Sequence, residues 1–387
     1  MMHYWKVRLT TFTPTFIGSG ETCKKDSYIY LEKNQSVCFL KEEKWISFLT
    51  EHDIMDDFAS ALINRGAHFD LYGYLKNQRT LQRKYKSVED VLETMAKVGA
   101  IDREVDYFSV RKDKGPNDIV GHIKDAEGNP YIPGSSLKGA FRTAILSHEI
   151  RKNLSCYRST WERLERAAGD KKEMGRIVDQ LEREMGISGG KDMVKSYFHG
   201  LTVSDAVLKK GKLCVAAKAD LSVGDDDIHQ VSLYRECLDV DSVLEFTVGI
   251  DDSEAGMGHF GIKSFADLQK VLQEFVDFQY DILQKPFRRN GDVELQDIRN
   301  HKNADLLLGG GTGFLTKTLI YSLAPDRGQA IYVTRKFMEK NTPRNHHHEQ
   351  DRQISPHTLK LISRRENGYM NQYLIGLCYL EEEKKLC

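Results

Sequence analysis

The stretch from Pro130 to Ile145 constrains the fold more than any other part of this sequence; it reads PYIPGSSLKGAFRTAI. Its two prolines keep the chain extended, and Gly134 then permits a tight turn. Ser135 or Ser136 is placed to cap the N-terminus of a helix. Apolar residues recur at helical spacing after this point, so the stretch predicts a strand followed by a helix whose buried face carries Leu137, Phe141, Ala144 and Ile145.

Two cations lie near the start of the predicted helix. Lys138 and Arg142 are four residues apart, so they share one face, roughly opposite the apolar one. The first backbone N–H groups of a helix have no partner within the helix, and the helix dipole adds positive potential there. Amides, dipole and cations together predict a phosphate-binding site at Ser135, Ser136, Lys138 and Arg142.

The segment YIPGSSLKGAFR, from Tyr131 to Arg142, resembles the signature of the RAMP proteins of type III CRISPR effector complexes. Within that family the chain looks most like the fifth subunit of the type III-A Csm complex, which caps the filament that carries the crRNA. This finer resemblance rests on three further stretches: Val7 to Gly20, Leu307 to Thr318 and Ser355 to Leu361. The residues from Ile150 to Leu306 show no motif that can be aligned by eye.

Strands and helices alternate in each half of the chain, which predicts an α+β fold. At 387 residues the chain is long enough for two or three domains. The resemblance implies two ferredoxin-like (RRM-type) domains, residues 1–220 and 221–387, with a helical insertion near residues 151–190 of the first. It also implies a thumb-like β-hairpin near residues 105–125, which presses on the guide RNA or on a neighbouring subunit.

Local patterns predict several individual elements. Tyr4 to Thr13 alternates as a strand, which must end before Pro14. Trp45 to Arg65 has helical spacing, and Ser87 begins a second helix with a capping-box sequence. Glu381 to Lys385 is expected to be a charged tail.

Charge is unevenly distributed along the chain, although the net charge is only −1. Residues 301–365 contain 11 Lys and Arg against 5 Asp and Glu, together with five histidines. Residues 220–254 contain a single Arg against 11 acidic residues. This contrast favours a protein that holds a polyanion on one surface and presents another to protein neighbours, although two solvated faces would give the same pattern.

The cysteines and the hydropathy pattern exclude several classes of protein. Seven cysteines are scattered without a C-x-x-C pair, so neither a disulfide framework nor a zinc site is indicated. No run of eighteen apolar residues is present, and the N-terminus has no apolar signal segment. We expect a soluble, cytoplasmic protein with no membrane partner.

A glycine turn at Gly18, Ser19 and Gly20 follows the first predicted strand. In the RAMP family the corresponding loop approaches the RNA backbone, and glycine lets a main chain come that close. Without the resemblance, the same residues indicate only a turn.

A second glycine loop, Gly309-Gly310-Gly311-Thr312-Gly313, has few steric limits, so its N–H groups can line an anion. A helix is expected to begin near Thr312 and to bring Lys317 close. The nucleotide-binding P-loop pattern is absent because no glycine precedes Lys317, which disfavours a phosphate-binding metabolic enzyme. The resemblance implies that this loop contacts RNA, and Phe314 either stacks on a base or belongs to the core.

Basic residues cluster at the tip of the expected hairpin. Arg111, Lys112 and Lys114 either keep an exposed sheet edge soluble or, as the resemblance implies, contact the RNA backbone.

Histidines cluster near the C-terminus. His346, His347 and His348 are consecutive and cannot all bind one metal from a regular strand or helix, so we expect a flexible loop and no metal site. His357 precedes a predicted strand within a resembling motif, which indicates a structural or RNA-contacting residue.

No pattern of catalytic residues is recognised. Glu21 and Asp26 are the acids nearest the first glycine loop, and neither lies in a motif for metal-dependent cleavage. No spacing links His3, His122 and His357, the histidines available for metal-free RNA cleavage.

The resemblance therefore implies a non-catalytic crRNA-binding subunit without a cofactor. Its expected partners are crRNA, the backbone RAMP subunits and small helical subunits of the Csm complex, and host nucleases that mature the crRNA 3′ end. The alternative is a crRNA-processing endoribonuclease of the same superfamily.

Overall fold

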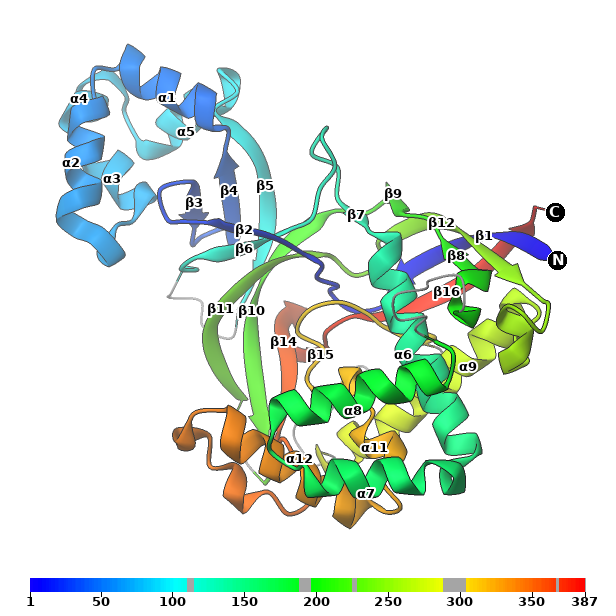
Figure 1. The fold of residues 1–387 in the computed structure, drawn as a ribbon. Coiled ribbons are helices and arrows are strands. Elements are labelled where there is room, and N and C mark those ends of the chain that lie inside the picture. Colours follow the sequence, from blue (N-terminus) through cyan, green and yellow to red (C-terminus); the bar gives the residue numbers. More distant parts are fainter. Residues whose placement is uncertain (110–114, 188–195, 225–227, 288–303, 367–368, 387) are drawn as a thin grey trace.

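The computed structural model describes residues 1–109, 115–187, 196–224, 228–287, 304–366 and 369–386. It confirms the predicted α+β class: two β-sheets occupy the centre of the molecule and helices pack around them (Figure 1). Helices α1–α5 form a lobe at one end of the molecule. Helices α6–α9, α11 and α12 pack against the sheets on the side away from this lobe. No helix of the described residues has the length and apolar character needed to cross a membrane.

Sheet A joins the two ends of the chain. Its central strand β1 (Met2–Thr11) pairs antiparallel with β12 (Val243–Asp251) and β16 (Leu377–Lys385). The described part of the sheet is completed by β13 (Leu306–Leu307), β9 (Ala206–Lys210), β7 (Tyr131–Ile132) and β8 (Leu201–Val203).

Strand β1 follows the predicted alternation and ends before Pro14. Trp5, Val7 and Leu9 are buried on one face, each contributing about 1.5–3 kcal/mol of burial free energy. On the other face Arg8 pairs with Glu381 (3.2 Å) and Glu383 of β16. The expected charged tail was therefore wrong: its acidic residues belong to strand β16, where the cations of β1 lie opposite them.

Sheet B carries most of the remaining strands. Its order is β2 (Gly18–Cys23), β6 (Ile119–His122), β11 (Ile228–Leu238), β10 (Leu213–Ser222), β5 (Ile101–Phe108), β4 (Ser36–Leu40) and β3 (Tyr28–Leu31), and β14 (Thr358–Glu366) pairs with β10 and with β15 (Tyr369–Leu374). The boundary expected at residue 220 falls inside β10, and the division into two domains stays a prediction.

The expected hairpin of β5 and β6 was wrong. The two strands do not pair with each other: β5 lies parallel to β10 and β6 lies parallel to β11. The antiparallel pair of β10 and β11 separates them because it supplies the longer ladder. Arg111, Lys112 and Lys114 lie outside the described residues.

The helical lobe has a hydrophobic core of its own, in which Trp45, Phe48, Phe58 and Phe69 pack together. It contains α1 (Glu42–Glu51), α2 (Met55–Arg65), α3 (Leu71–Asn77), α4 (Arg79–Lys84) and α5 (Val88–Lys97). The single helix expected from Trp45 to Arg65 was wrong. Helix α1 ends at Glu51 and α2 begins at Met55, and between them Asp53 has a positive φ of 50°. The capping box at Ser87 is confirmed.

Helix α6 (Gly134–Lys152) is the predicted helix of the signature stretch, and its four expected apolar residues are buried. The predicted serine cap was wrong: the N-cap is Pro133, so Ser135 and Ser136 already lie within the first turn. The helical insertion follows as α7 (Arg158–Arg166) and α8 (Lys171–Glu184). Both pack through sparse apolar positions such as Trp161 and Leu181.

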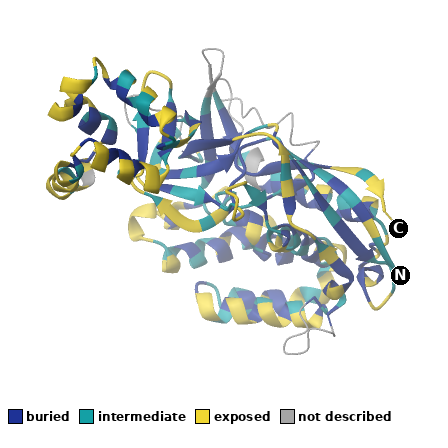
Figure 2. Cartoon of the chain, turned by 90° about the horizontal axis from the view of Figure 1, so that it is seen from above, coloured by how far each residue is buried: buried dark blue, intermediate teal, exposed yellow. Residues whose placement is uncertain are grey.

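The main core runs between the two sheets and these helices. It joins Leu9 and Leu244 of sheet A, Val215 of sheet B, Phe141 of α6 and Leu268 of α9 (Phe265–Gln279). Figure 2 shows the buried residues along the strands and on the inner sides of the helices, with exposed residues on outer turns. Two more helices of the described chain, α11 (Ile320–Leu323) and α12 (Arg327–Asn341), follow the second glycine loop in the sequence.

Candidate nucleic-acid interface

The turn expected at Gly18–Gly20 was wrong: these residues begin strand β2, which pairs with β6 through an irregular register. The residues directly before this first glycine segment contact the second glycine loop, although the two are far apart in the sequence. The Gly310 amide donates a hydrogen bond to the Phe16 carbonyl (2.8 Å), directly before β2. The contact needs glycine: Gly309 has φ +92°, and a Cβ there would lie 2.2 Å from the Phe16 oxygen. Gly376 fixes the same junction, since its amide donates to the Pro14 carbonyl (3.1 Å).

Two cations lie beside these loops. The Arg235 guanidinium is 5.3 Å from the centre of the Phe16 ring, and its Nη1 is 3.3 Å from the position that a Cβ on Gly311 would take. Burial lowers the pKa of Lys317, and the nearby Arg235 charge lowers it further. We call Gly18–Gly20, Gly309–Gly313, Arg235 and Lys317 the glycine-loop site.

The two cations of the glycine-loop site have no carboxylate in direct contact among the residues that the structure describes, although the charge of Asp220 acts on Arg235 from nearby. Within the described part of the chain, no carboxylate forms an ion pair with Arg235 or Lys317. Burial also lowers the pKa of Arg235, which means that holding both cations charged here costs free energy. A bound phosphate would offset this cost because it supplies the missing negative charge.

Arg235 was missed by the sequence analysis because it is the single cation of the acidic segment 220–254. Alternation along β11 separates it from Glu236, whose buried carboxylate binds Lys124 and Arg103 (2.5 and 2.6 Å). Burial would raise the pKa of Glu236, but these two cations hold it below its ordinary value. The alternation of residues along β11 could have indicated that Arg235 and Glu236 point to opposite faces of the sheet.

A further cationic group lies on the neighbouring strands. Lys360 of β14 and Lys218 of β10 share the carboxylate of Asp220, at 2.9 and 3.2 Å. The register of the two strands sets Asp220 opposite Lys360. Two cations on one carboxylate leave one positive charge in excess.

A pocket of about 750 Å³ lies between this group and the second glycine loop. Its lining includes Thr312, Gly313, Phe314, His348, His357 and Lys360. It therefore joins residues from two of the motifs that the sequence singled out, one at 309–313 and one at 355–361.

The second glycine loop differs in detail from the prediction. The helix expected near Thr312 was wrong: a 3₁₀ turn (Leu315–Lys317) and the short α11 follow instead. Thr312 and Thr316 share a hydrogen bond (2.8 Å) that closes the loop on itself. The Phe314 ring stacks on Phe337 (centroids 5.3 Å apart), so base stacking by Phe314 stays a prediction.

At the start of α6 the protein itself occupies the predicted anion site. The Gly134 amide donates to the Asp205 carboxylate (2.7 Å). Lys138 donates to the Leu201 carbonyl (2.5 Å), and its Nζ lies 5.6 Å from the centre of the Phe198 ring. Arg142 forms an ion pair with Glu182 of α8. RNA contact by Ser135, Ser136, Lys138 and Arg142 stays a prediction.

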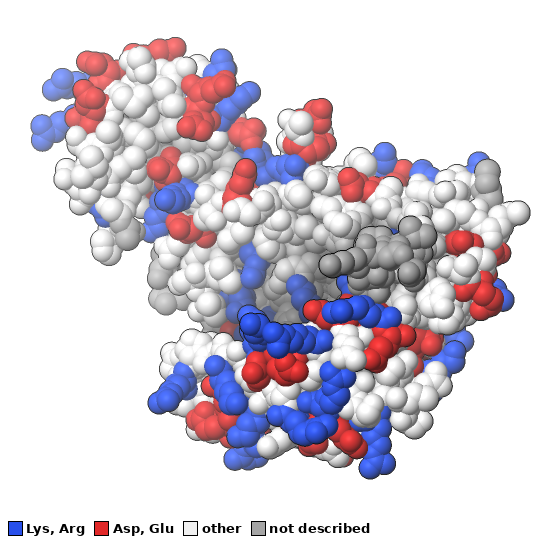
Figure 3. Space-filling model, in the orientation of Figure 1, with Lys and Arg blue, Asp and Glu red and all other residues white. Residues whose placement is uncertain are grey.

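Figure 3 shows where charged side chains gather on one face of the molecule. Lys and Arg side chains form a band between the sheets and helices α7 and α8, with acidic side chains among them. This mixture agrees with the ion pair of Arg142 and Glu182, which ties α6 to α8.

The candidate histidines have separate environments. His3 hydrogen-bonds Asp252 (3.2 Å) in sheet A. His122 is buried: its Nδ1 accepts from the Ile17 amide (3.3 Å), and its Nε2 donates to the Tyr131 carbonyl (3.1 Å). Burial lowers the pKa of His122 to about 4, so this ring stays neutral and supports the first glycine loop.

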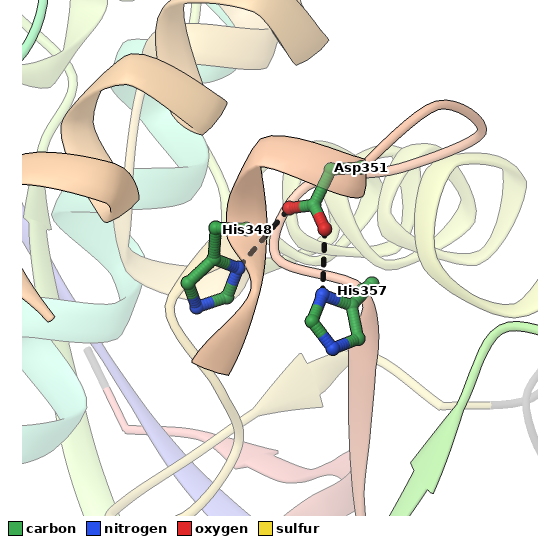
Figure 4. A group of neighbouring side chains, drawn as sticks. All are labelled: His348, Asp351 and His357. Atoms are coloured by element: carbon green, nitrogen blue, oxygen red, sulfur yellow. Dashed lines mark hydrogen bonds and ion pairs between the residues drawn. The ribbon is translucent and has the colours of Figure 1, made fainter. Parts of the chain in front are cut away.

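His357 belongs to a cluster that the sequence analysis did not identify. Its Nδ1 lies 2.6 Å from one carboxylate oxygen of Asp351, and the Nδ1 of His348 lies 3.1 Å from the other (Figure 4). Burial alone would raise the pKa of Asp351, but these hydrogen bonds bring it below its ordinary value. The spacing H-x₂-D-x₅-H was the available signal, obscured by the neighbouring His346 and His347.

Comparisons with known proteins agree on one family. The family model described as the RAMP superfamily matches residues 8–327. The Csm5 protein of Enterococcus italicus is 25% identical over 330 residues, which cover 83% of this chain and 81% of the relative. Csm5 of Streptococcus thermophilus is 27% identical over 330 residues, 81% of this chain and 80% of the relative.

Two solved structures have a similar fold. The crystal structure of T. onnurineus Csm5 has a TM-score of 0.58 at 18% identity and covers 96% of this chain and 99% of its own. A chain of a cryo-EM structure of a Csm–crRNA–target RNA ternary complex of a type III-A system has a TM-score of 0.55 at 18% identity, with 98% and 100% covered.

Proposed function

The chain belongs to the RAMP superfamily, and on that premise we propose that it is a non-catalytic crRNA-binding subunit of a type III-A Csm effector complex. Its similarity to Csm5 proteins and to a chain of a Csm–crRNA–target RNA complex supports membership of such a complex. The observation that carries RNA binding is the glycine-loop site, where the second glycine loop packs against the residues that lead into β2, beside Arg235 and Lys317.

The chemistry of the glycine-loop site suits recognition of a sugar–phosphate backbone. Glycine lets main-chain amides approach phosphate oxygens, and Arg235 and Lys317 supply charge. Neither kind of contact reads a base edge, so binding is expected to be independent of sequence. A subunit that must accept any spacer requires this property.

The finer role concerns position in the complex. We place this subunit at the end of the filament near the crRNA 3′ end, beside the backbone RAMP subunits and the small helical subunits. There it assists maturation of the crRNA 3′ end in the cytoplasm by admitting host nucleases. The resemblance of three separate stretches to a filament-capping subunit supports this role.

A crRNA-processing endoribonuclease is the competing function. It would need an acid and a base near one 2′-hydroxyl. His122 uses both ring nitrogens within the fold, and His3 pairs with Asp252. His357 alone among the three lies in the pocket beside the second glycine loop.

A binding and cleavage assay separates the two functions. The purified protein is incubated with end-labelled, mature-length crRNAs that carry two unrelated spacers, with and without Mg²⁺. We expect similar affinity for both, no cleavage, and a linear fall of log affinity with log salt concentration. Cleavage at a fixed distance from the repeat would instead support the endoribonuclease.

A further inference from the structure

The cluster of His348, Asp351 and His357 has the composition of a transition-metal site. Each residue offers one ligand atom, and the three atoms lie within 4.8 Å of one another. Two imidazole nitrogens and one carboxylate oxygen are the donors that zinc accepts in proteins. His348 begins a short 3₁₀ turn (His348–Gln350), Asp351 directly follows it, and His357 directly precedes β14.

The charge balance of the cluster also favours a cation. The Asp351 side chain is only 1% exposed, and no Lys or Arg of the described residues forms an ion pair with it. Its side-chain partners include the imidazoles of His348 and His357, at 3.1 and 2.6 Å. A divalent ion would give this buried carboxylate a positively charged partner in addition to its hydrogen bonds.

The present distances are close to those of a ligated metal. The Asp351 oxygens lie 2.6 and 3.1 Å from the two Nδ1 atoms. Ligands at about 2.0–2.1 Å from a tetrahedral zinc ion lie about 3.3 Å apart. The two gaps, which involve different Asp351 oxygens, differ from this spacing by less than about 1 Å, whereas the three ligand atoms, which lie within 4.8 Å of one another, need to approach by up to about 1.5 Å. Figure 4 shows both rings turned toward the carboxylate through Nδ1.

We propose that His348, Asp351 and His357 bind one zinc-like divalent metal ion, with an open coordination position facing the pocket beside the second glycine loop. The two imidazoles line that pocket, together with Thr312 and Lys360. A site with three protein ligands keeps a fourth position for water or for an oxygen of a bound molecule. The inference stands whether or not the proposed function is correct.

The test uses the full chain without a histidine tag, titrated with Co²⁺ and followed by its visible absorption, after which Zn²⁺ displaces the Co²⁺. We expect one equivalent per chain. His357→Ala and Asp351→Asn should lower the affinity by at least about 100-fold. The matched control is His347→Ala, because His347 is the exposed neighbour of His348 and should leave binding unchanged.

A second measurement keeps the test decisive if a variant is unstable. Zinc should raise the melting temperature of the wild-type chain and of His347→Ala, while His357→Ala, melted in parallel, should not respond. Absence of stoichiometric binding by the wild-type chain would overturn the proposal. An equal loss of binding in His347→Ala would also overturn it, since it would mean that the ion binds the histidine run on the surface.

Discussion

The start of α6 and the glycine-loop site have the same ingredients for binding phosphate, but the fold uses them differently. Both combine backbone amides with two cations. At α6 the protein supplies the partners: Asp205 accepts from the Gly134 amide, and Glu182 pairs with Arg142. At the glycine-loop site no carboxylate of the described chain pairs with either cation.

This difference separates a structural use of charge from a binding use. Cations that are already paired fix α6 against β8 and α8, whereas cations left without a carboxylate can gain free energy from an external anion. Amide and cation spacing alone therefore cannot identify a phosphate site, because the sequence does not show which acids fold back onto it.

The largest effect should come from removing Arg235 and Lys317, which form no ion pair within the described part of the chain. Arg235→Ala combined with Lys317→Ala should lower crRNA affinity by roughly 10- to 100-fold, because two charged contacts are lost. The slope of log affinity against log salt concentration should fall by about 1.4, since about 0.7 is expected for each phosphate of a single strand. Fluorescence anisotropy with two unrelated spacers at several salt concentrations measures both quantities.

The matched control removes equal charge elsewhere. Lys209 and Lys210 on β9 are exposed, so Lys209→Ala with Lys210→Ala makes the same change in net charge. Affinity that falls equally in both double variants would mean that only overall charge matters, and the glycine-loop site would lose its assignment.

Sequence reasoning found the parts of the fold that depend on local patterning. The α+β class, strand β1, the buried face of α6 and the capping box at Ser87 all follow from periodicity or capping chemistry. The same reasoning failed for the β5–β6 hairpin, because pairing was decided by the distant strands β10 and β11.

The candidate site shows the same limit. Each glycine loop was visible alone, but their contact depends on a backbone hydrogen bond between Phe16 and Gly310. Composition could not reveal Arg235, because residues 220–254 contain eleven acidic residues and no other cation. In the structure, alternation along β11 places Arg235 on the opposite face of the strand from its neighbour Glu236. The sequence alone therefore did not determine which distant strands and loops pair with each other.

An intermediate loss of RNA affinity is expected when the contact between the second glycine loop and Phe16 is disturbed. Gly309→Ala places a Cβ 2.2 Å from the Phe16 oxygen, so the loop must move away. Gly313→Ala meets nothing within 4 Å and adds only the strain of φ +101°, about 1–2 kcal/mol. We expect RNA affinity to fall about tenfold for Gly309→Ala and less than threefold for Gly313→Ala. Equal affinities would show that the junction of the loops does not shape the RNA site.

The smallest effect on RNA binding is expected at α6, where stability should change instead. Arg142→Met leaves Glu182, whose side chain is 16% exposed, without its cation, and Lys138→Met leaves the Leu201 carbonyl without its donor. Each should lower the free energy of unfolding by about 1–2 kcal/mol in urea titrations, with RNA affinity unchanged within threefold.

A double-mutant cycle completes this test, in which Glu182→Leu is combined with Arg142→Met. Removing both partners restores an apolar contact between α6 and α8, so the double variant should recover most of the lost stability. A structural ion pair predicts this recovery, whereas a phosphate contact does not. If Arg142→Met instead leaves unfolding unchanged and weakens RNA binding as much as the change at Arg235 and Lys317, the start of α6 belongs to the RNA interface and the contrast between the two regions disappears.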